Sequence, residues 1–148
     1  MTALDTTNPI PAAPSRILVA EDDTNVRDFC MRLLRMNGYQ AAPAENGRVA
    51  LERLNESHYD LVLTDLQMPE MGGIELLHEL RQYHPGVDSI VMTAHATVET
   101  AREALKLGAF DYLPKPVKRE MLVAALEKWV PQPTVLAMPA EKLMALLT

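Results

Sequence analysis

A run of apolar residues that ends in a carboxylate, at positions 61–65, constrains the fold of this chain more than any other stretch. Residues 61–63 are Leu, Val and Leu, and a continuous run of this kind is typical of a strand buried on both faces. Asp65 ends the run, and a turn begins at positions 68–69 (Met-Pro) and closes at 72–73 (Gly-Gly). Open α/β sheets bind ligands at the carboxyl ends of their strands. Asp65 is therefore predicted to lie at the edge of the sheet where a ligand site is expected.

Short apolar segments alternate with helical patterns through the middle of the chain. Short connections between five strands and five helices indicate a parallel sheet with helices on both faces. Because crossovers are right-handed, we predict a flavodoxin-like, doubly wound α/β fold whose five-stranded sheet has the order 2-1-3-4-5. The predicted strands are 16–20, 39–44, 61–65, 89–92 and 109–113. The first predicted helix begins at Asp23 or Thr24, and the second begins at Asn46. The third, fourth and fifth span residues 73–83, 97–107 and 117–130.

Apolar residues at helical spacing mark the helix faces that contact the sheet. In the first helix they include Phe29, and in the third they are Ile74, Leu77 and Leu80. In the fourth helix the apolar positions are Val98, Ala101, Leu105 and Leu107.

The charge balance narrows the class of partner. Among 148 residues, 20 Asp and Glu outnumber 14 Lys and Arg, for a net charge of −6. Nonspecific nucleic-acid binding requires a basic face, so we expect no direct nucleic-acid binding by this segment. Cys30, in a helical pattern, is interpreted as a small buried residue rather than a reactive thiol. A single cysteine, with no secretory signal and no apolar stretch long enough to span a membrane, predicts a cytoplasmic protein without membrane contact.

Proline-containing segments flank the predicted domain, which covers residues 16–130. Residues 1–15 are predicted to be a flexible lead-in. Residues 131–148 form a linker or tail in which residues 140–147 have the pattern of a short helix. That helix has three interpretations that the sequence leaves open: it docks on the domain, it docks on a partner, or it is the remnant of a removed output domain.

Two acidic residues, Glu21 and Asp22, follow the first strand, which lies beside the third in the predicted sheet. They are therefore expected to approach Asp65. Three carboxylates in one crevice repel each other unless a cation is present, and hard oxygen ligands suit Mg²⁺. We predict Mg²⁺ on Asp22 and Asp65, with the backbone carbonyl of Gln67 completing the ligand set. The alternative is that Glu21 and Asp22 merely begin an acidic helix N-terminus.

A hydroxyl and an ammonium are expected to flank these carboxylates. Thr93 ends the fourth strand, and Lys115 follows the fifth between two prolines that fix the local backbone. Taken singly, each residue is more simply a strand end or a solvated charge, but four separate strand ends rarely give this set by accident. A carboxylate can attack phosphorus and form an acyl phosphate, and phosphoryl transfer needs neutralised oxygens. The set therefore indicates phosphoryl transfer to Asp65.

The same runs resemble the receiver domain of two-component response regulators across residues 16–130. The resemblance rests on residues 17–23, on 65–69 with the glycines at 72–73, on Thr93-Ala94, and on 108–116. It implies a signalling switch rather than a conventional enzyme.

The resemblance also implies roles for individual residues. Asp65 would accept a phosphoryl group from a phosphohistidine of a sensor histidine kinase or of a histidine phosphotransfer protein. Asp22 would bind Mg²⁺ directly and Glu21 through water. Thr93 and Tyr112 would be the switch residues, and Lys115 would precede a cis-like bond to proline. The fourth helix, fifth strand and fifth helix would then present a changed face to an output domain or partner.

Two positions depart from common residue choices and are expected to change the lifetime of the phosphoryl group. Gln67 lies two residues after Asp65, and His95 lies two residues after Thr93. The resemblance places both beside the attacking water, so we predict altered self-dephosphorylation, without a direction.

Three other readings compete with an active receiver. A phosphatase with an Asp nucleophile would need an acid where Gln67 stands, and a flavin-binding protein would place hydroxyls where Glu21 and Asp22 stand. A degenerate receiver that only binds partners would not need Lys115. Within the receiver interpretation, the chain is either a single-domain regulator or a receiver cut from a larger regulator or hybrid kinase.

Overall fold

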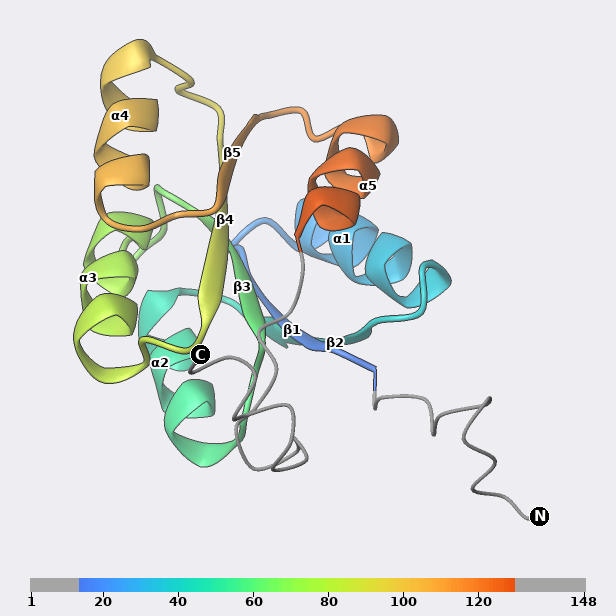
Figure 1. Cartoon of the computed structure of the whole chain (residues 1–148), viewed down its shortest axis with the longest axis horizontal. Helices are drawn as coiled ribbons and strands as arrows, with labels where there is room; N and C mark the ends of the chain where they lie inside the picture. Colours follow the sequence, from blue (N-terminus) through green and yellow to red (C-terminus); the bar gives the residue numbers. More distant parts are fainter. Residues whose placement is uncertain (1–13, 130–148) are drawn as a thin grey trace, which may run out of the picture.

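The computed structural model describes residues 14–129, and Figure 1 shows their arrangement. The predicted segment 1–15 lies almost wholly, and the predicted tail 131–148 wholly, outside the described residues. The strands are β1 (Arg16–Ala20), β2 (Gln40–Ala44), β3 (Leu61–Asp65), β4 (Asp88–Thr93) and β5 (Asp111–Pro114). The helices are α1 (Thr24–Met36), α2 (Gly47–Glu56), α3 (Gly73–Tyr83), α4 (Val98–Lys106) and α5 (Arg119–Lys128).

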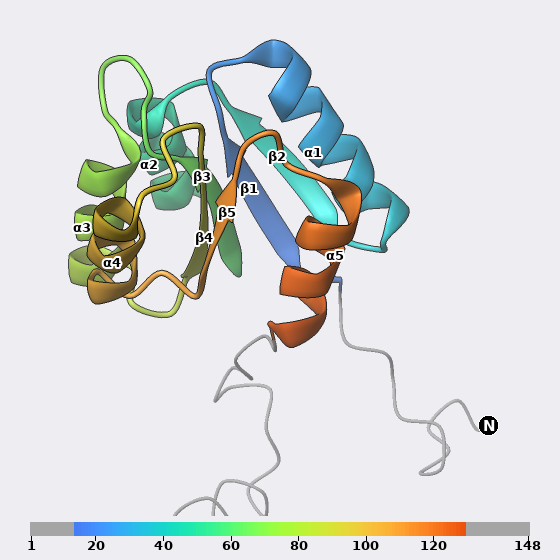
Figure 2. The same cartoon turned by 90° about the horizontal axis from the view of Figure 1, so that it is seen from above.

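All five strands are parallel and lie in the order β2-β1-β3-β4-β5, which confirms the predicted α/β fold and strand order. Helices α1 and α5 cover one face of the sheet and helices α2, α3 and α4 cover the other, as Figure 2 shows from above. β3 lies at the centre, and all five of its residues are buried. Its continuous apolar run therefore reflects contact with helices on both faces.

The two faces of the sheet support separate apolar cores. Alternate strand residues point to opposite faces, so Leu61 and Leu63 pack with α1 and α5 while Val62 packs with α2 and α3. Burial of these side chains, at about 25 cal/mol per Å² of apolar surface, is the main force that holds the helices on the sheet.

The helix ends agree with the capping residues in the sequence. Of the two predicted N-caps of α1, Asp23 is the one observed, and its side chain accepts hydrogen bonds from the backbone N–H groups of Asn25 and Val26. Asn46 caps α2 by accepting from the N–H of Val49. Gly38 follows α1 with φ +88, a left-handed conformation in which glycine has no Cβ clash.

Some predicted helix faces were wrong in detail. On α3, Leu77 and Leu80 are buried as predicted and Ile74 is partly buried against the same core, while the buried Leu76 was not predicted. Two predicted apolar positions of α4, Val98 and Leu105, are exposed; the single fully buried residue of that helix is Ala104. On α1, Phe29 is exposed as well. An apolar pattern gives the period of a helix, but the neighbouring elements decide which part of a wide stripe is covered.

The last strand and helix are shorter than predicted. The N–H of Ala109 donates to the carbonyl of Ala104, which closes the turn that ends α4, and β5 begins only at Asp111. Helix α5 begins at Arg119, and Trp129 is its C-cap.

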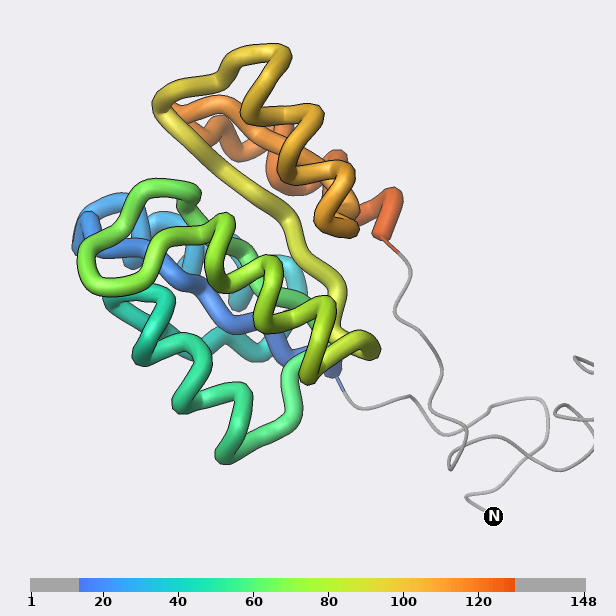
Figure 3. Tube along the Cα trace, turned by 90° about the vertical axis from the view of Figure 1, so that its left-hand side faces the viewer, coloured from blue at the N-terminus to red at the C-terminus, as the bar shows by residue number. Residues whose placement is uncertain are grey.

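Figure 3 looks onto the face formed by α2, α3 and α4, with α4 at its edge. No helix within residues 14–129 is long and apolar enough to cross a membrane.

Candidate functional site

Three carboxylates meet at the carboxyl ends of β1 and β3. One oxygen from each of Glu21, Asp22 and Asp65 lies within 4.8 Å of the others. Glu21 is fully buried and Asp65 is 5% exposed, whereas Asp22 is open to solvent. The sequence prediction that these residues converge is therefore confirmed, and Asp65 ends β3 as predicted.

The backbone around Glu21 is fixed from two directions. Its N–H donates to the carbonyl of Ala44 at 3.0 Å, which extends the pairing of β1 with β2. Its carbonyl accepts from Nη1 of Arg27 at 2.8 Å. Sequence reasoning missed Arg27, because a basic residue in the first turns of a helix has no pattern that announces a contact with the preceding loop.

Lys115 reaches the carboxylates from the end of β5. Its N–H donates to the carbonyl of Thr93 at 2.8 Å, and its peptide bond to Pro116 is cis. Its Nζ lies 2.7 Å from Oδ2 of Asp65 and 2.5 Å from Oε1 of Glu21. Lys115 therefore contacts Asp65 as predicted, although the two residues are 50 positions apart in the sequence.

Burial and the neighbouring charges together shift the pKa values of two groups in the site. Burial, together with repulsion from Asp65, raises the pKa of the Glu21 carboxyl to about 7, although Lys115 opposes the change. Burial lowers the pKa of the Lys115 ammonium, but its hydrogen bonds to Asp65 and Glu21 outweigh that effect and raise the pKa overall. Lys115 therefore stays protonated, and the cluster retains excess negative charge.

These residues fit a divalent cation such as Mg²⁺. Three carboxylates supply hard oxygen ligands, and one ammonium does not neutralise them. Gln67 lies beside them, because its N–H donates to Oδ1 of Asp65 at 3.2 Å.

Glycine is required where α3 begins, next to Asp65. A Cβ on Gly73 would lie 2.2 Å from the carbonyl oxygen of Asp65 and 2.8 Å from Cα of Leu66. The N–H of Gly73 donates to the carbonyl of Leu66 at 2.9 Å, which closes the loop. The predicted Gly-Gly turn thus brings the helix against the end of β3.

The two predicted switch residues lie on neighbouring strands, each with a hydrogen-bond partner. Thr93 is 1% exposed, and its Oγ1 accepts from the N–H of His95 at 3.1 Å. The hydroxyl of Tyr112, on β5, lies 2.8 Å from Oγ1 of Thr100. No hydrogen bond joins Thr93 to Asp65 in the part of the chain that the structure describes. Thr100 was not predicted, since nothing in the sequence pairs it with a residue 12 positions away.

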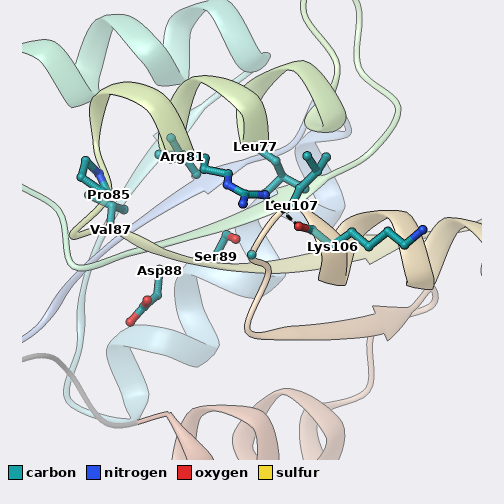
Figure 4. A pocket seen from close by; sticks show the side chains of 10 residues that line it. Leu77, Arg81, Pro85, Val87, Asp88, Ser89, Lys106 and Leu107 are labelled. Atoms are coloured by element: carbon teal, nitrogen blue, oxygen red, sulfur yellow. Dashed lines mark hydrogen bonds between the residues drawn. The ribbon is translucent and has the colours of Figure 1, made fainter.

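Other features of the described residues lie apart from this cluster. Cys30 is buried, and burial raises the pKa of its thiol to about 12, in agreement with an inert core residue. A cavity of about 280 Å³ lies between the C-terminal ends of α3 and α4 (Figure 4). Asp88 and Ser89, at the start of β4, line it, so it lies at the opposite end of that strand from Thr93. It contains none of the predicted site residues.

The sequence of residues 17–127 matches the family described as response regulator receiver domain. The chain belongs to this family. The receiver is a part of two-component signal transduction, and its acidic cluster lies at the site expected for phosphorylation. A receiver implies a histidine kinase as partner and is not a conventional enzyme, so the phosphatase and flavin alternatives are set aside.

Curated relatives are transcriptional regulators of greater length. The receiver is 48% identical over 112 residues to the transcriptional regulatory protein ZraR of Escherichia coli strain K12, and 46% identical over 104 residues to the regulatory protein AtoC of that strain. These alignments cover 76% and 70% of this chain, and 25% and 23% of the relatives. The chain therefore spans about a quarter of the length of the curated relatives it matches.

Solved structures agree with the fold. A CheY-like response regulator receiver domain protein from Methanospirillum hungatei JF-1 is 30% identical, with a TM-score of 0.73. That alignment covers 78% of this chain and 92% of the other. CheY4 of Vibrio cholerae is 25% identical, with a TM-score of 0.74, and the alignment covers 80% of this chain and 100% of the other.

Proposed function

We propose that this receiver is a phosphorylation-dependent switch in which Asp65 accepts the phosphoryl group. The donor is a phosphohistidine of a sensor histidine kinase or of a histidine phosphotransfer protein. One observation carries the proposal: the Asp65 carboxylate is 2.7 Å from the Lys115 ammonium and within 4.8 Å of two further carboxylates. This is a nucleophile set among groups that bind a cation and phosphoryl oxygens.

The transfer forms one bond and breaks one. An oxygen of Asp65 bonds to phosphorus while the phosphorus–nitrogen bond of the donor breaks, and the electron pair stays on the imidazole, which takes up a proton. The product on this chain is an acyl phosphate. In the reverse direction of the switch, water attacks phosphorus, the bond to the Asp65 oxygen breaks, and inorganic phosphate and the carboxylate are released.

Asp22, Asp65 and the backbone carbonyl of Gln67 are the proposed direct ligands of Mg²⁺, with Glu21 acting through water. When bound, Mg²⁺ neutralises the carboxylates and the phosphoryl oxygens. Lys115 remains charged and is placed to contact a phosphoryl oxygen on Asp65.

Thr93 is the proposed switch hydroxyl and Tyr112 the proposed switch aromatic. Thr93 ends the strand next to β3, so its hydroxyl can turn from the N–H of His95 toward a phosphoryl group on Asp65. Gln67 and His95 are the proposed residues that tune the lifetime of that group. The N–H of Gln67 donates to Asp65 and the N–H of His95 donates to Thr93, so both residues lie beside the site. Both residues are exposed, which places their side chains where water reaches the site.

The surface of α4, β5 and α5 is the proposed contact for an output domain or partner. Val98 and Leu105, on α4, are 73% and 52% exposed, and Phe110, next to β5, is 41% exposed. The names of the curated relatives describe transcriptional regulators. We therefore propose that the receiver controls transcription, either as a single-domain regulator or as the receiver of a larger protein. The net charge of −6 supports the absence of direct nucleic-acid contact by this segment.

Acetyl phosphate and Mg²⁺ test the central step, with intact mass as the measurement. Wild-type protein is expected to gain one phosphoryl group, and Asp65→Asn none. Asp23→Asn is a matched control, because asparagine also caps helices and Asp23 is not one of the clustered carboxylates. Absence of the adduct from wild type, or its persistence in Asp65→Asn, would refute the assignment.

A further inference from the structure

A continuous series of hydrogen bonds joins Thr93 to Tyr112 through the start of α4. The N–H of His95 donates to Oγ1 of Thr93 at 3.1 Å. The carbonyl of the same residue accepts from Oγ1 of Thr100 at 3.0 Å. Oγ1 of Thr100 in turn lies 2.8 Å from the hydroxyl of Tyr112. The side chain of Thr100 therefore contacts both the loop that follows Thr93 and the aromatic ring on β5.

The hydroxyl of Thr100 has the hydrogen-bonding capacity that this arrangement requires. A threonine hydroxyl donates one hydrogen bond and accepts two. Its proton can go to the carbonyl of His95 at 3.0 Å or to that of Thr97 at 3.1 Å, and it accepts from the N–H of Thr97 at 3.0 Å. The remaining lone pair can accept from the hydroxyl of Tyr112 at 2.8 Å, where the hydroxyl of Thr97, at 3.0 Å, is the competing donor. Meanwhile Oγ1 of Thr97 accepts from the N–H of Thr100 at 3.1 Å, so the helix keeps an N-cap of its own.

Helix α4 depends on such bonds because little of it is buried. Ala104 is its single fully buried residue, and at its other end the carbonyl of Lys106 accepts from Nη1 of Arg81 at 2.9 Å. Figure 3 shows α4 at the edge of its helical layer. Elements with few buried apolar side chains open at low free-energy cost, so the hydrogen bonds at their ends govern their position.

We propose that Thr100 is the positioning residue that couples Thr93 to Tyr112 in the resting receiver, by holding the N-terminal end of α4 to both. When Thr93 turns toward Asp65, its bond to the N–H of His95 breaks. The loop is then free to move, the carbonyl of His95 leaves Thr100, and Tyr112 loses its partner. The direction of this change rests on the proposed function, whereas the coupling itself is a property of the resting fold.

Amide hydrogen exchange of the whole chain in EDTA tests the coupling without any phosphoryl chemistry. Thr100→Val and Tyr112→Phe are each expected to speed exchange at the start of α4 by about three- to tenfold, the effect of losing one hydrogen bond. The double variant is expected to exchange no faster than Thr100→Val, because Thr100→Val already removes the bond that Tyr112→Phe removes. Thr100→Ser retains the hydroxyl and is expected to exchange like wild type.

Arg81→Ala is the matched control. It removes the hydrogen bond at the other end of the same helix and shares no partner with Thr100 or Tyr112, so its effect on exchange is expected to add to that of Tyr112→Phe. Unchanged exchange in Thr100→Val, or additive effects of Thr100→Val and Tyr112→Phe, would overturn the proposal.

A second measurement asks whether the Thr100–Tyr112 bond stabilises the resting state in particular, which we call the latch, or merely stabilises the helix. Fluoroberyllate with Mg²⁺ serves as the phosphoryl analogue, and calorimetry gives its apparent affinity. If the Thr100–Tyr112 bond exists only in the resting state, its loss in Tyr112→Phe disfavours that state. Fluoroberyllate is then expected to bind this variant about threefold or more tightly than wild type. Weaker binding would overturn the latch. If the protein is phosphorylated by acetyl phosphate but the variants change neither amide exchange nor fluoroberyllate affinity, only the proposed role of Thr100 is refuted. If the variants show both changes but acetyl phosphate adds no phosphoryl group, only the role of Asp65 is refuted.

Discussion

At the scale of single residues, Lys115 determines how much charge the resting site retains. Its ammonium lies between Asp65 and Glu21, and Asp22 adds a third carboxylate at the solvent side. Burial of the Glu21 carboxyl, with repulsion from Asp65 added to it, raises its pKa to about 7 even though Lys115 opposes the change. The metal-free site is therefore under electrostatic repulsion, and either a cation or removal of a carboxylate relieves it.

Asp22→Asn should consequently have opposite effects without and with Mg²⁺. In EDTA the variant should unfold at a higher temperature than wild type, because one repelling charge is gone. In about 10 mM Mg²⁺ wild type should gain about 1–2 kcal/mol, or a few degrees in Tm, by binding the ion in the folded state, and the variant much less. Differential scanning calorimetry measures both. Asp23→Asn, beside it in sequence, should respond to Mg²⁺ as wild type does; an equal response in Asp22→Asn would contradict its role as a ligand.

At the scale of elements, the start of α3 fixes the position of Asp65. The helix begins with Gly73 against the backbone of residues 65 and 66, closer than any side chain allows. Because the obstructing atoms are backbone, no rotamer change relieves the contact, and either the helix or the end of β3 must shift.

Gly73→Ala is therefore expected to lower the free energy of unfolding by about 1–3 kcal/mol, as overpacking at a buried site does. It should also slow phosphorylation by acetyl phosphate, since Asp65 moves relative to Lys115. Urea unfolding and intact mass are the measurements. Gly86→Ala is the matched control, because a Cβ added at Gly86 would meet no atom within 4 Å and its φ lies outside the left-handed region. Equal stability of the Gly73→Ala protein would show that the loop adapts without strain.

The limits of prediction are clearest among the helices. The convergence of Glu21, Asp65 and Lys115 followed from strand order alone, because parallel strands bring their carboxyl ends to one edge. The burial of Ala104 and the bond between Thr100 and Tyr112 did not follow, since each depends on how one helix lies against a strand. Periodicity gives an element, whereas single polar contacts between elements need the packed structure.

At the scale of the whole molecule, β4 connects the site to the far end of the fold. Thr93 ends this strand beside the acidic cluster, and Asp88 begins it at the opposite edge. There Oδ2 of Asp88 accepts from Nε1 of Trp129 at 2.8 Å, and Trp129 packs on Tyr39 with ring centroids 6.3 Å apart. The last described residue of the domain is thus attached to the start of β4 and to the residue that precedes β2, on the face that α1 and α5 cover.

Asp88→Ala tests what this attachment contributes to the whole domain. The variant leaves the indole N–H of a tryptophan that is 4% exposed without its partner, so the free energy of unfolding should fall by about 1–3 kcal/mol. Trp129 is the one tryptophan of the chain, and its fluorescence in a urea titration reports the loss as a lower midpoint with an unchanged slope. Asp88→Asn keeps an acceptor oxygen and should lose less. Phosphorylation by acetyl phosphate should be unaffected in both variants, because the bond lies at the opposite edge of the sheet from Asp65. A midpoint equal to that of wild type would show that α5 is held by apolar packing alone.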